Sequence, residues 1–489
     1  MRHIKYFSLV ICVLLSLVFV ASASAAPARA DRGTWAPNTA YAVNDTVTYG
    51  GCTYKVIQAH TSLTGWEPPV VPALFQQLSC GVVATNTSTR TNTPAGPTST
   101  PTRTSSPTIT KTPGAATSTP TKTATRTNTT IGPTATITRT ATITPTSPST
   151  GGTLPKHAMI GYWHNFDNGS GFIPLRNVST KWDVVIVSFG EPTNGATGGT
   201  IGFTPYPTYY TSGSLFTSDV AYLHSIGKKV LISIGGANGM VQLTTTGARD
   251  NFVSSVNSII STYGFDGLDV DFENQSLTVN AGDTDFTAPT TPVIVNTISA
   301  IRSVQSHFGS SFILTMAPET FFVQLGYQFY GGTCSGCDRR AGAFLPVIYA
   351  TRDILTWLQV QDYNSGSITG LDNAYHSMGG ADFHIAMLDM LLAGFPVAGT
   401  GKTFPALRAD QVVLGIPATG SAGNGYVAPA TVQQALDYII KGTATGSYVK
   451  HSANAANFRG VMTWSVNWDA YGNIFEFSNF YRAYLNSLP

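Results

Sequence analysis

The sequence predicts an α/β protein, a (β/α)8 barrel over residues 154–489, preceded by a small all-β module and a disordered Thr/Pro-rich linker. Three observations predict this organisation. Short apolar runs alternate with segments of helical periodicity through the C-terminal part of the chain. Residues 81–153 are mostly Thr, Ser, Pro, Ala and Gly with no acid, so they form no core. The 489 residues also exceed the size of one ordinary domain.

Eight runs of the C-terminal region are expected to form strands, at 159–163, 183–189, 229–234, 265–273, 312–316, 355–360, 411–416 and 460–464. Helices are expected at 219–226, 252–260, 292–305 and 431–440. Pro292 suits a first helical turn, while Gly264 and Gly442 mark helix ends. Eight strand–helix units in one domain predict a barrel, and its active site is expected at the carboxyl ends of the strands.

The first 26 residues have the pattern of a secretory signal peptide. Arg2 and Lys5 precede an uncharged apolar run from Tyr6 to Val20, and small residues follow through Ala25 and Ala26. A membrane anchor is the alternative, but the apolar run is short for a bilayer span. We expect cleavage after Ala25 or Ala26 and a secreted, extracellular protein with no membrane association.

The charge balance argues against a nucleic-acid partner. Loss of residues 1–26 removes two of the 27 basic residues, so basic and acidic residues balance at 25 each. A nucleic-acid-binding protein usually carries a basic excess or a basic face. A neutral polysaccharide is the more natural partner, and we expect a monomer.

The cysteine count indicates disulfides rather than a metal. Of 5 Cys, Cys12 leaves with the signal peptide, and Cys52, Cys80, Cys334 and Cys337 remain. An even number in an exported chain favours disulfides. Cys334 and Cys337 lack the second Cys pair or nearby His of a zinc site, so a local disulfide is the better reading. No metal or cofactor is predicted.

Residues 32–80 form a small aromatic piece with two short strands expected around a Gly50-Gly51 turn. A Cys52–Cys80 bridge would hold its thin core. The W…Y…D-x-V-x-Y-x-G-x-x-Y pattern resembles the chitin-binding modules of carbohydrate-binding families 5 and 12. The segment lacks their adjacent Trp pair, and Phe75 stands where Trp is frequent. Trp66 and Tyr54 are candidates for stacking on sugar, with core packing as the alternative; core packing is expected for Tyr41, Tyr49 and Phe75.

The run from Asp266 to Glu273 places three acids on one face of a buried strand. Side chains alternate along a strand, so Asp269, Asp271 and Glu273 point one way and the apolar residues between them point the other. Burial of three like charges raises at least one pKa and favours proton sharing. A calcium loop or a solvated acidic turn fits poorly, because Leu, Val and Phe fill the gaps.

The octet resembles the D-G-x-D-x-D-x-E signature of glycoside hydrolase family 18, the chitinases and their relatives. Four more segments resemble pieces of that family in the expected order: Ser233–Gly236, Met316–Glu319, Gln361–Asn364 and Gly460–Ser465. The resemblance covers most of residues 155–489. It implies a (β/α)8 barrel and a retaining mechanism in which the substrate's own N-acetyl group attacks.

The resemblance assigns the roles of the acids. Glu273 would protonate the glycosidic oxygen, and Asp271 would orient the acetamide. Asp269 would share or hold a proton with Asp271, which keeps Glu273 protonated at rest. Tyr363 would hydrogen-bond the acetamide carbonyl, and Trp464 would floor the subsite of the distorted sugar.

Further residues are expected around these acids. Cleft-lining positions are expected at Tyr162, Phe189, Met316, Glu319, Gln361 and Asn364. Ser233, Gly235 and Gly236 are expected to pack and hydrogen-bond beneath the acids. Asp266, on the opposite face by parity, is expected to be structural. A core role is the alternative for Trp464 and Tyr363.

These observations together predict a secreted chitinase that cuts β-1,4 bonds between N-acetylglucosamine units. Residues 418–458 leave room for a loop and a helix but no extra domain, which favours an open groove and endo cleavage. The rival readings are an endo-β-N-acetylglucosaminidase acting on N-glycans, a sugar-binding protein without catalysis, and a peptidoglycan hydrolase. The resemblance to chitin-binding modules argues against the first, and the presence of Glu273 argues against the second.

Overall fold

The computed structural model describes residues 30–37, 39–57, 60–62, 67–69, 74–80, 153–333, 336 and 338–489. The predicted signal peptide, the predicted linker up to residue 152, Trp66, Cys334 and Cys337 lie outside the described residues.

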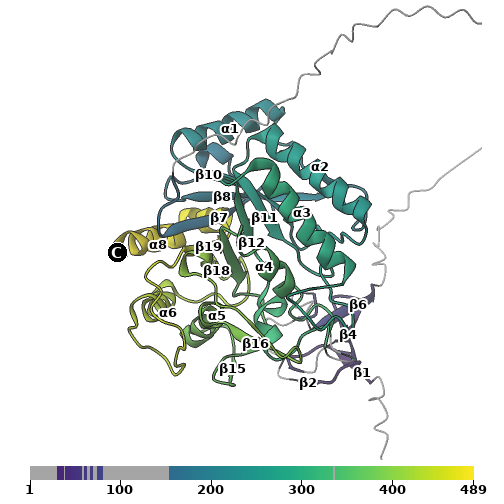
Figure 1. Cartoon of the computed structure of the whole chain (residues 1–489). Helices are drawn as coiled ribbons and strands as arrows, with labels where there is room; N and C mark the ends of the chain where they lie inside the picture. The colour runs from purple at the N-terminus through teal and green to yellow at the C-terminus, as the bar shows by residue number, and fades with distance from the viewer. Residues whose placement is uncertain are drawn as a thin grey trace, which may run out of the picture. The chain divides into compact units, whose positions relative to one another are not determined.

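The larger part is a closed barrel of eight parallel strands (Figure 1). The order β10-β11-β12-β13-β18-β19-β7-β8 closes because β10 also pairs with β8. The strands are β7 (Ala158–His164), β8 (Val184–Pro192), β10 (Lys229–Gly235), β11 (Gly267–Asp271), β12 (Ile313–Met316), β13 (Trp357–Gln361), β18 (Val412–Pro417) and β19 (Gly460–Trp464). All eight predicted strands are confirmed, and short β9 (Ile201–Gly202) adds to β8 antiparallel.

Helices surround the barrel (Figure 1). They are α1 (Gly213–Ser225), α2 (Thr246–Tyr263), α3 (Pro292–Phe308), α4 (Leu345–Thr351), α5 (Ala381–Ala393), α6 (Pro429–Lys441), α7 (Val466–Ala470) and α8 (Glu476–Ser487). The four predicted helices correspond to α1, α2, α3 and α6, and α2 and α6 end at Gly264 and Gly442 as predicted. The sequence did not predict α4, α5, α7 or α8. In α5, residues 383–391 are all buried, so the helix shows no polar stripe that would indicate it.

Short elements decorate the loops of this part. They are η1 (Leu175–Asn177), η2 (Thr320–Phe322), η3 (Gln324–Tyr327), η4 (Ala409–Gln411), η5 (Tyr471–Asn473), and the two-stranded sheets β14 (Ile368–Thr369) with β15 (Tyr375–His376) and β16 (Phe395–Val397) with β17 (Lys402–Phe404). Between β18 and β19, the segment 418–458 contains loops and one helix, α6, as the sequence predicts.

The barrel separates two apolar layers. Outward-facing Leu268, Val270 and Phe272 belong to the large core between strands and helices. A second cluster fills the barrel interior with residues from several strands, including Ile160, Leu231, Ile313, Trp357 and Met462. The acids of β11 face inward, since Asp269 contacts the side chains of strands on both sides. The alternation predicted for this strand is therefore confirmed.

The small part is a four-stranded sheet in the order β1-β3-β4-β6. Its strands are β1 (Asp31–Thr34), β3 (Thr46–Tyr49), β4 (Cys52–Val56) and β6 (Phe75–Cys80), and β2 (Ala40–Tyr41) pairs with β5 (His60–Thr61). Gly50 and Gly51 join β3 to β4 with positive φ at both positions, which suits a tight hairpin turn. The predicted hairpin is thus confirmed.

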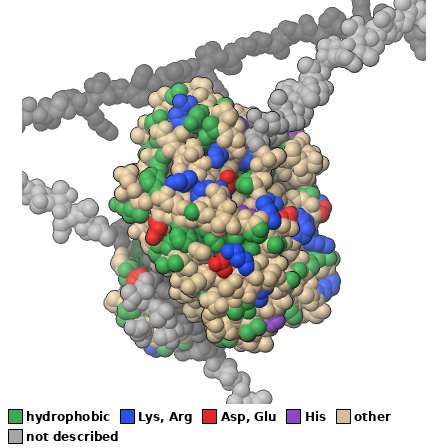
Figure 2. All heavy atoms as spheres, turned by 90° about the vertical axis from the view of Figure 1, so that its left-hand side faces the viewer, with side chains coloured by type: hydrophobic (Ala, Val, Ile, Leu, Met, Phe, Trp, Pro, Cys, Tyr) green, Lys and Arg blue, Asp and Glu red, His purple; other side chains and the backbone are tan. Residues whose placement is uncertain are grey.

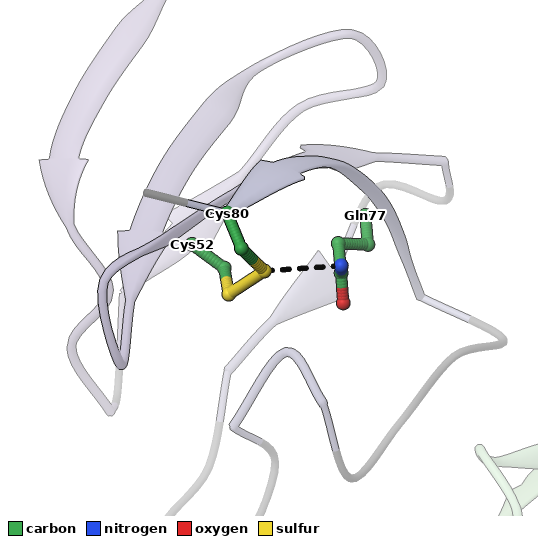
Figure 3. Close-up of a disulfide and its surroundings, with 3 residues drawn as sticks. All are labelled: Cys52, Gln77 and Cys80. Atoms are coloured by element: carbon green, nitrogen blue, oxygen red, sulfur yellow. Dashed lines mark hydrogen bonds between the residues drawn. A yellow bond between two sulfur atoms is a disulfide. The ribbon is translucent and has the colours of Figure 1, made fainter. Parts of the chain in front are cut away.

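A disulfide joins the inner and edge strands of the small sheet. Cys52 on β4 and Cys80 on β6 are opposite each other and bonded, and Gln77 donates a hydrogen bond to the Cys80 sulfur (Figure 3). The predicted Cys52–Cys80 pairing is confirmed. The core beside it contains Trp35, Tyr41, Tyr54 and Phe75, so the predicted core roles of Tyr41 and Phe75 hold; Tyr49 packs against it from a half-buried position.

None of the described helices is long and apolar enough to cross a bilayer. On the face shown in Figure 2, Lys and Arg side chains lie scattered among neutral and acidic ones.

Candidate active site

Asp269 is the most enclosed of the three acids. Its carboxylate accepts four hydrogen bonds and has no exposed surface. The Tyr162 and Ser233 hydroxyls donate to Oδ2 at 2.6 and 2.7 Å, and Thr315 Oγ1 and Gln359 Nε2 donate to Oδ1 at 2.6 and 3.0 Å. Burial raises the pKa of Asp269, and the four hydrogen bonds oppose that rise. In the described chain no hydrogen bond joins Asp269 to Asp271, so the predicted sharing of a proton between these two acids finds no direct contact in this structure.

Asp271 and Glu273 lie close together at the end of β11. Gln361 Nε2 lies 3.0 Å from Asp271 Oδ1 and 3.3 Å from Glu273 Oε1, so one amide bridges both carboxyls. A bond to the Ala317 carbonyl at 2.9 Å fixes the same nitrogen. Burial, then the charges of Glu273, Asp269 and Glu319, hold the pKa of Asp271 well above its usual range. Burial also raises the pKa of Glu273, as an acid catalyst requires.

Two tyrosines face the acids. The Tyr162 hydroxyl binds Asp269, while Tyr363 is buried among the acids. Burial and the neighbouring carboxylates raise the pKa of both phenols far above the ordinary value. Each phenol therefore remains protonated: the Tyr162 hydroxyl donates to Asp269, and the Tyr363 hydroxyl is able to donate a hydrogen bond to a ligand.

Aromatic rings form one wall of the cleft. Trp464 lies half-buried at the end of β19, 5.7 Å from Tyr162 and 5.8 Å from Phe189 between ring centroids. Phe166 packs on His164 at 4.7 Å, and His164 lies 4.5 Å from Trp464. Such a wall offers flat apolar faces to the C–H side of a pyranose.

The cleft is lined by most of the residues the sequence predicts. Tyr162, Phe189, Asp271, Glu273, Glu319, Gln361, Tyr363, Asn364 and Trp464 meet there. Asn364 also joins two loops. Its backbone nitrogen donates to the Asn424 carbonyl, and its side-chain Oδ1 accepts from the Asn424 backbone nitrogen.

Met316 is not brought to the cleft. Thr315 takes the inward position and reaches Asp269, so alternation turns Met316 outward into the core between barrel and helices, where it has no exposed surface. Its predicted contact with substrate therefore finds no support in this placement.

Gly235 and Gly236 lie beneath the acids rather than on the open surface. A Cβ at Gly235 would meet the Asp271 carbonyl oxygen at 2.0 Å, and one at Gly236 would meet the Phe189 ring at 2.7 Å. Gly236 N also donates to the Asp271 carbonyl at 2.8 Å. The pair thus allows β10 to approach the strand end that holds Asp271.

The predicted sugar-stacking residues of the small part have different outcomes. Tyr54 is 5% exposed and packs in the core of the sheet, so its ring offers no open face. Trp66 lies outside the described residues. Its role in binding stays a prediction.

Three residues that contribute to the site were not predicted from the sequence. Thr315 and Gln359 complete the shell around Asp269, and Phe166 extends the aromatic wall. A signal for Gln359 exists: it and Gln361 are polar residues two apart in an otherwise apolar strand, so they share the inward face. In the described part of the chain, no three His, Cys, Asp or Glu side chains are grouped to hold a metal ion.

Comparison with known proteins places both folded parts. Residues 34–76 match carbohydrate-binding module family 5/12, and residues 158–365 match glycosyl hydrolases family 18. Chitinase Chi52 of Paenibacillus xylanexedens is 46% identical over 94% of this chain and 93% of its own length. Exochitinase 1 of Streptomyces olivaceoviridis is 57% identical over 69% of this chain and 58% of its own length.

A solved structure extends this likeness to three dimensions. The crystal structure of a family GH18 chitinase from Chromobacterium violaceum is 32% identical, with a TM-score of 0.62, and covers 93% of this chain and 100% of that one. The chain is therefore a glycoside hydrolase that belongs to glycosyl hydrolases family 18 and carries a family 5/12 carbohydrate-binding module.

Proposed function

We propose that this protein is a secreted chitinase that hydrolyses internal β-1,4 bonds between N-acetylglucosamine units. One observation carries the proposal. Asp269, Asp271 and Glu273 occupy one inward face at the end of β11, and among the described residues none of them pairs with a cation. Buried carboxyls without cationic partners have raised pKa values, and a general acid at neutral pH needs such a carboxyl.

The proposed reaction begins with protonation. Glu273 gives its proton to the glycosidic oxygen as the bond between this oxygen and the anomeric carbon breaks. The sugar that contains this anomeric carbon also carries an acetamide group, whose oxygen attacks the same carbon. The product of this step is an oxazolinium ion. Asp271 lies beside Glu273 on the shared Gln361 amide, where its carboxylate orients the acetamide N–H and balances the positive charge. Tyr363 donates to the acetamide oxygen.

The second step returns the enzyme to its starting state. Ionised Glu273 takes a proton from water, the water oxygen bonds to the anomeric carbon, and the acetamide oxygen leaves. Two inversions at one carbon leave the product with the β-configuration of the substrate. Asp269 acts through its charge, which raises the pKa of Asp271, while its four donors hold it in place.

Chitin is favoured as the substrate by two independent features. The family 5/12 module is joined to the same chain, and a tethered module raises the local concentration of enzyme on an insoluble surface. The relatives with high identity are named chitinases. The apolar N-terminal run supports secretion.

The test is anomer-resolved chromatography of early products from an N-acetylglucosamine hexamer. Wild-type protein should release β-anomers, and Glu273→Gln should release none. Cleavage to α-anomers would contradict the retaining mechanism. Absence of cleavage by wild type, with the hexamer still bound, would contradict the chitinase assignment and make N-glycans the next substrate.

Endo action rests on the short segment 418–458, which contains α6 and loops but no further domain that would deepen the cleft. Long oligomers labelled at one end should yield several internal fragments at the earliest times. Release of disaccharide alone from one end would contradict endo action.

A further inference from the structure

Glu319 lies beside Asp271 and Glu273 and is held there by the backbone. It follows β12 after Ala317 and Pro318 and forms a parallel bridge with Gln361. Gln361 N donates to the Pro318 carbonyl at 2.9 Å. Because the Gln361 side chain also bridges Asp271 and Glu273, one residue fixes Glu319 and the catalytic acids in one layer.

The Glu319 carboxyl lines the cleft without a protein partner. Among the described residues it makes no hydrogen bond and no ion pair within 4.0 Å. Arg340 is the cation whose charge reaches it, but the Arg340 guanidinium donates to Asp338 at 3.0 Å and lies 5.2 Å over the Phe321 ring. A carboxyl in such a position is free to bond a ligand.

The surroundings of Glu319 favour its uncharged form. The titratable groups that face it are Asp271 at the end of β11, Glu273 just after that strand, Tyr363 after β13, and Arg340 from the loop after η3. Burial and the charge of Glu273 raise the pKa of Glu319 to about 8, and Arg340 opposes this rise. Near neutral pH the group is therefore a carboxylic acid with one O–H donor that needs an acceptor.

The sugar is the available acceptor. An N-acetylglucosamine chain carries hydroxyl, ring and amide oxygens along the edges of its sugar rings. We propose that Glu319 is an uncharged hydrogen-bond donor to an oxygen of the sugar bound beside Glu273, and that its ionisation weakens substrate binding. This inference rests on the proposed function. Glu319 keeps its proton throughout, so the bonds made and broken in the reaction are unchanged.

Three variants test the role of Glu319. Glu319→Leu removes the donor, Glu319→Gln keeps an uncharged donor that does not titrate, and Asp250→Asn removes an exposed acid of α2 as the control for charge. KM and kcat for the hexamer are measured from about pH 6 to about pH 10, a range that brackets the Glu319 pKa of about 8. Thermal unfolding checks that each variant is folded.

The expected result is a separation of KM from kcat. Glu319→Leu should raise KM about tenfold below pH 8, since one hydrogen bond is lost. Glu319→Gln should recover most of that loss. In wild type and Asp250→Asn, KM should rise as pH passes through the Glu319 pKa of about 8, and in Glu319→Gln it should stay flat.

Other results would overturn the inference. An unchanged KM in Glu319→Leu would show that the sugar does not bond Glu319. Equal loss of kcat in Glu319→Leu and Glu319→Gln would make Glu319 a proton donor instead. A wild type that cuts no oligomer contradicts the proposed function, and this inference with it, whereas a cutting wild type beside an unaffected Glu319→Leu contradicts the role of Glu319 alone.

Discussion

The two ends of β11 bury acids in opposite environments. At the amino end, Asp266 accepts from His224 Nε2 at 2.8 Å, from Lys229 Nζ at 3.1 Å and from Val230 N at 2.8 Å. At the carboxyl end, Asp271 and Glu273 both meet the uncharged amide of Gln361, and the charge of Glu273 acts on Asp271. Both ends are buried, so burial alone does not separate a structural acid from a catalytic one.

We infer that the role of each acid depends on the groups that its carboxyl contacts. Lys229 compensates the charge of Asp266, and the bonds from Lys229 and His224 tie β10 and α1 to β11, in line with the structural role that parity predicted for Asp266. Carboxyls that lack such partners keep their protons to higher pH and respond to a ligand. Fold stability is therefore expected to depend on the amino end of the strand, and chemistry on the carboxyl end.

Glu273→Gln should have the largest effect. The amide has the shape of the acid but no proton to give, so kcat should fall by about 10²- to 10⁴-fold. Because no ion pair is lost, the melting temperature should stay near that of wild type. Initial rates on the hexamer and a thermal melt of the same preparation check both points, and a variant with more than a tenth of wild-type kcat would remove Glu273 from its role.

Asp266→Leu should damage the fold instead. It leaves Lys229 and His224 without their carboxylate, and loss of one partner from a buried pair costs about 3–5 kcal/mol. Urea unfolding measures this free energy. The folded fraction should retain wild-type kcat; a stable variant with reduced kcat would erase the contrast between the two ends.

Asp362 is intermediate between the acids at the two ends of β11, because it has one buried partner. His384 Nδ1 lies 3.3 Å from Asp362 Oδ2. Burial raises the pKa of Asp362 to about 6. A carboxyl with a raised folded pKa stabilises the fold below its unfolded pKa of about 3.9, and this contribution is lost as pH rises through the folded value. The variant Asp362→Asn should remove roughly 1–3 kcal/mol of the decline in unfolding free energy between about pH 4 and about pH 7.

Urea titrations of wild type and Asp362→Asn across that range test this sign. A variant whose stability falls as steeply as that of wild type would show that other groups cause the decline.

Tyr162→Phe should have the smallest effect. It removes one of four donors to Asp269 and keeps the ring beside Trp464, so a loss of about tenfold in kcat/KM is expected from one hydrogen bond to a charged group. Tyr484→Phe, which removes a 2.9 Å bond to Asp437 on α6, is the matched control and should leave kcat/KM unchanged. Equal effects of the two variants would show that the Asp269 shell has no special importance.

Local rules predicted the parts of the site that lie along one strand. Alternation placed Asp269, Asp271 and Glu273 inward and Asp266 elsewhere, and apolar runs located all eight strands. The same rule, applied to β12, would have turned Met316 outward, but its place in a family motif outweighed parity. The error shows that a resemblance does not replace the geometry of the strand.

Contacts between different strands could not be predicted from the sequence. Thr315 and Gln359 meet Asp269 only because the barrel closes in one register, and no local pattern contains that register. Tyr54 was ambiguous for a related reason: an aromatic ring suits both a thin core and a sugar, and the packing of the sheet decides between them.

The nucleophile remains the point on which the proposed chemistry depends, because Asp271 is close enough to Glu273 to share Gln361 and is itself a carboxylate. The decisive measurement compares kcat for two aryl chitobiosides, one with N-acetyl groups and one with N-trifluoroacetyl groups. Fluorine withdraws electrons from the amide oxygen, so attack by the acetamide predicts a sharp fall in kcat for the fluorinated substrate. Equal kcat values would contradict this mechanism and assign the attack to Asp271.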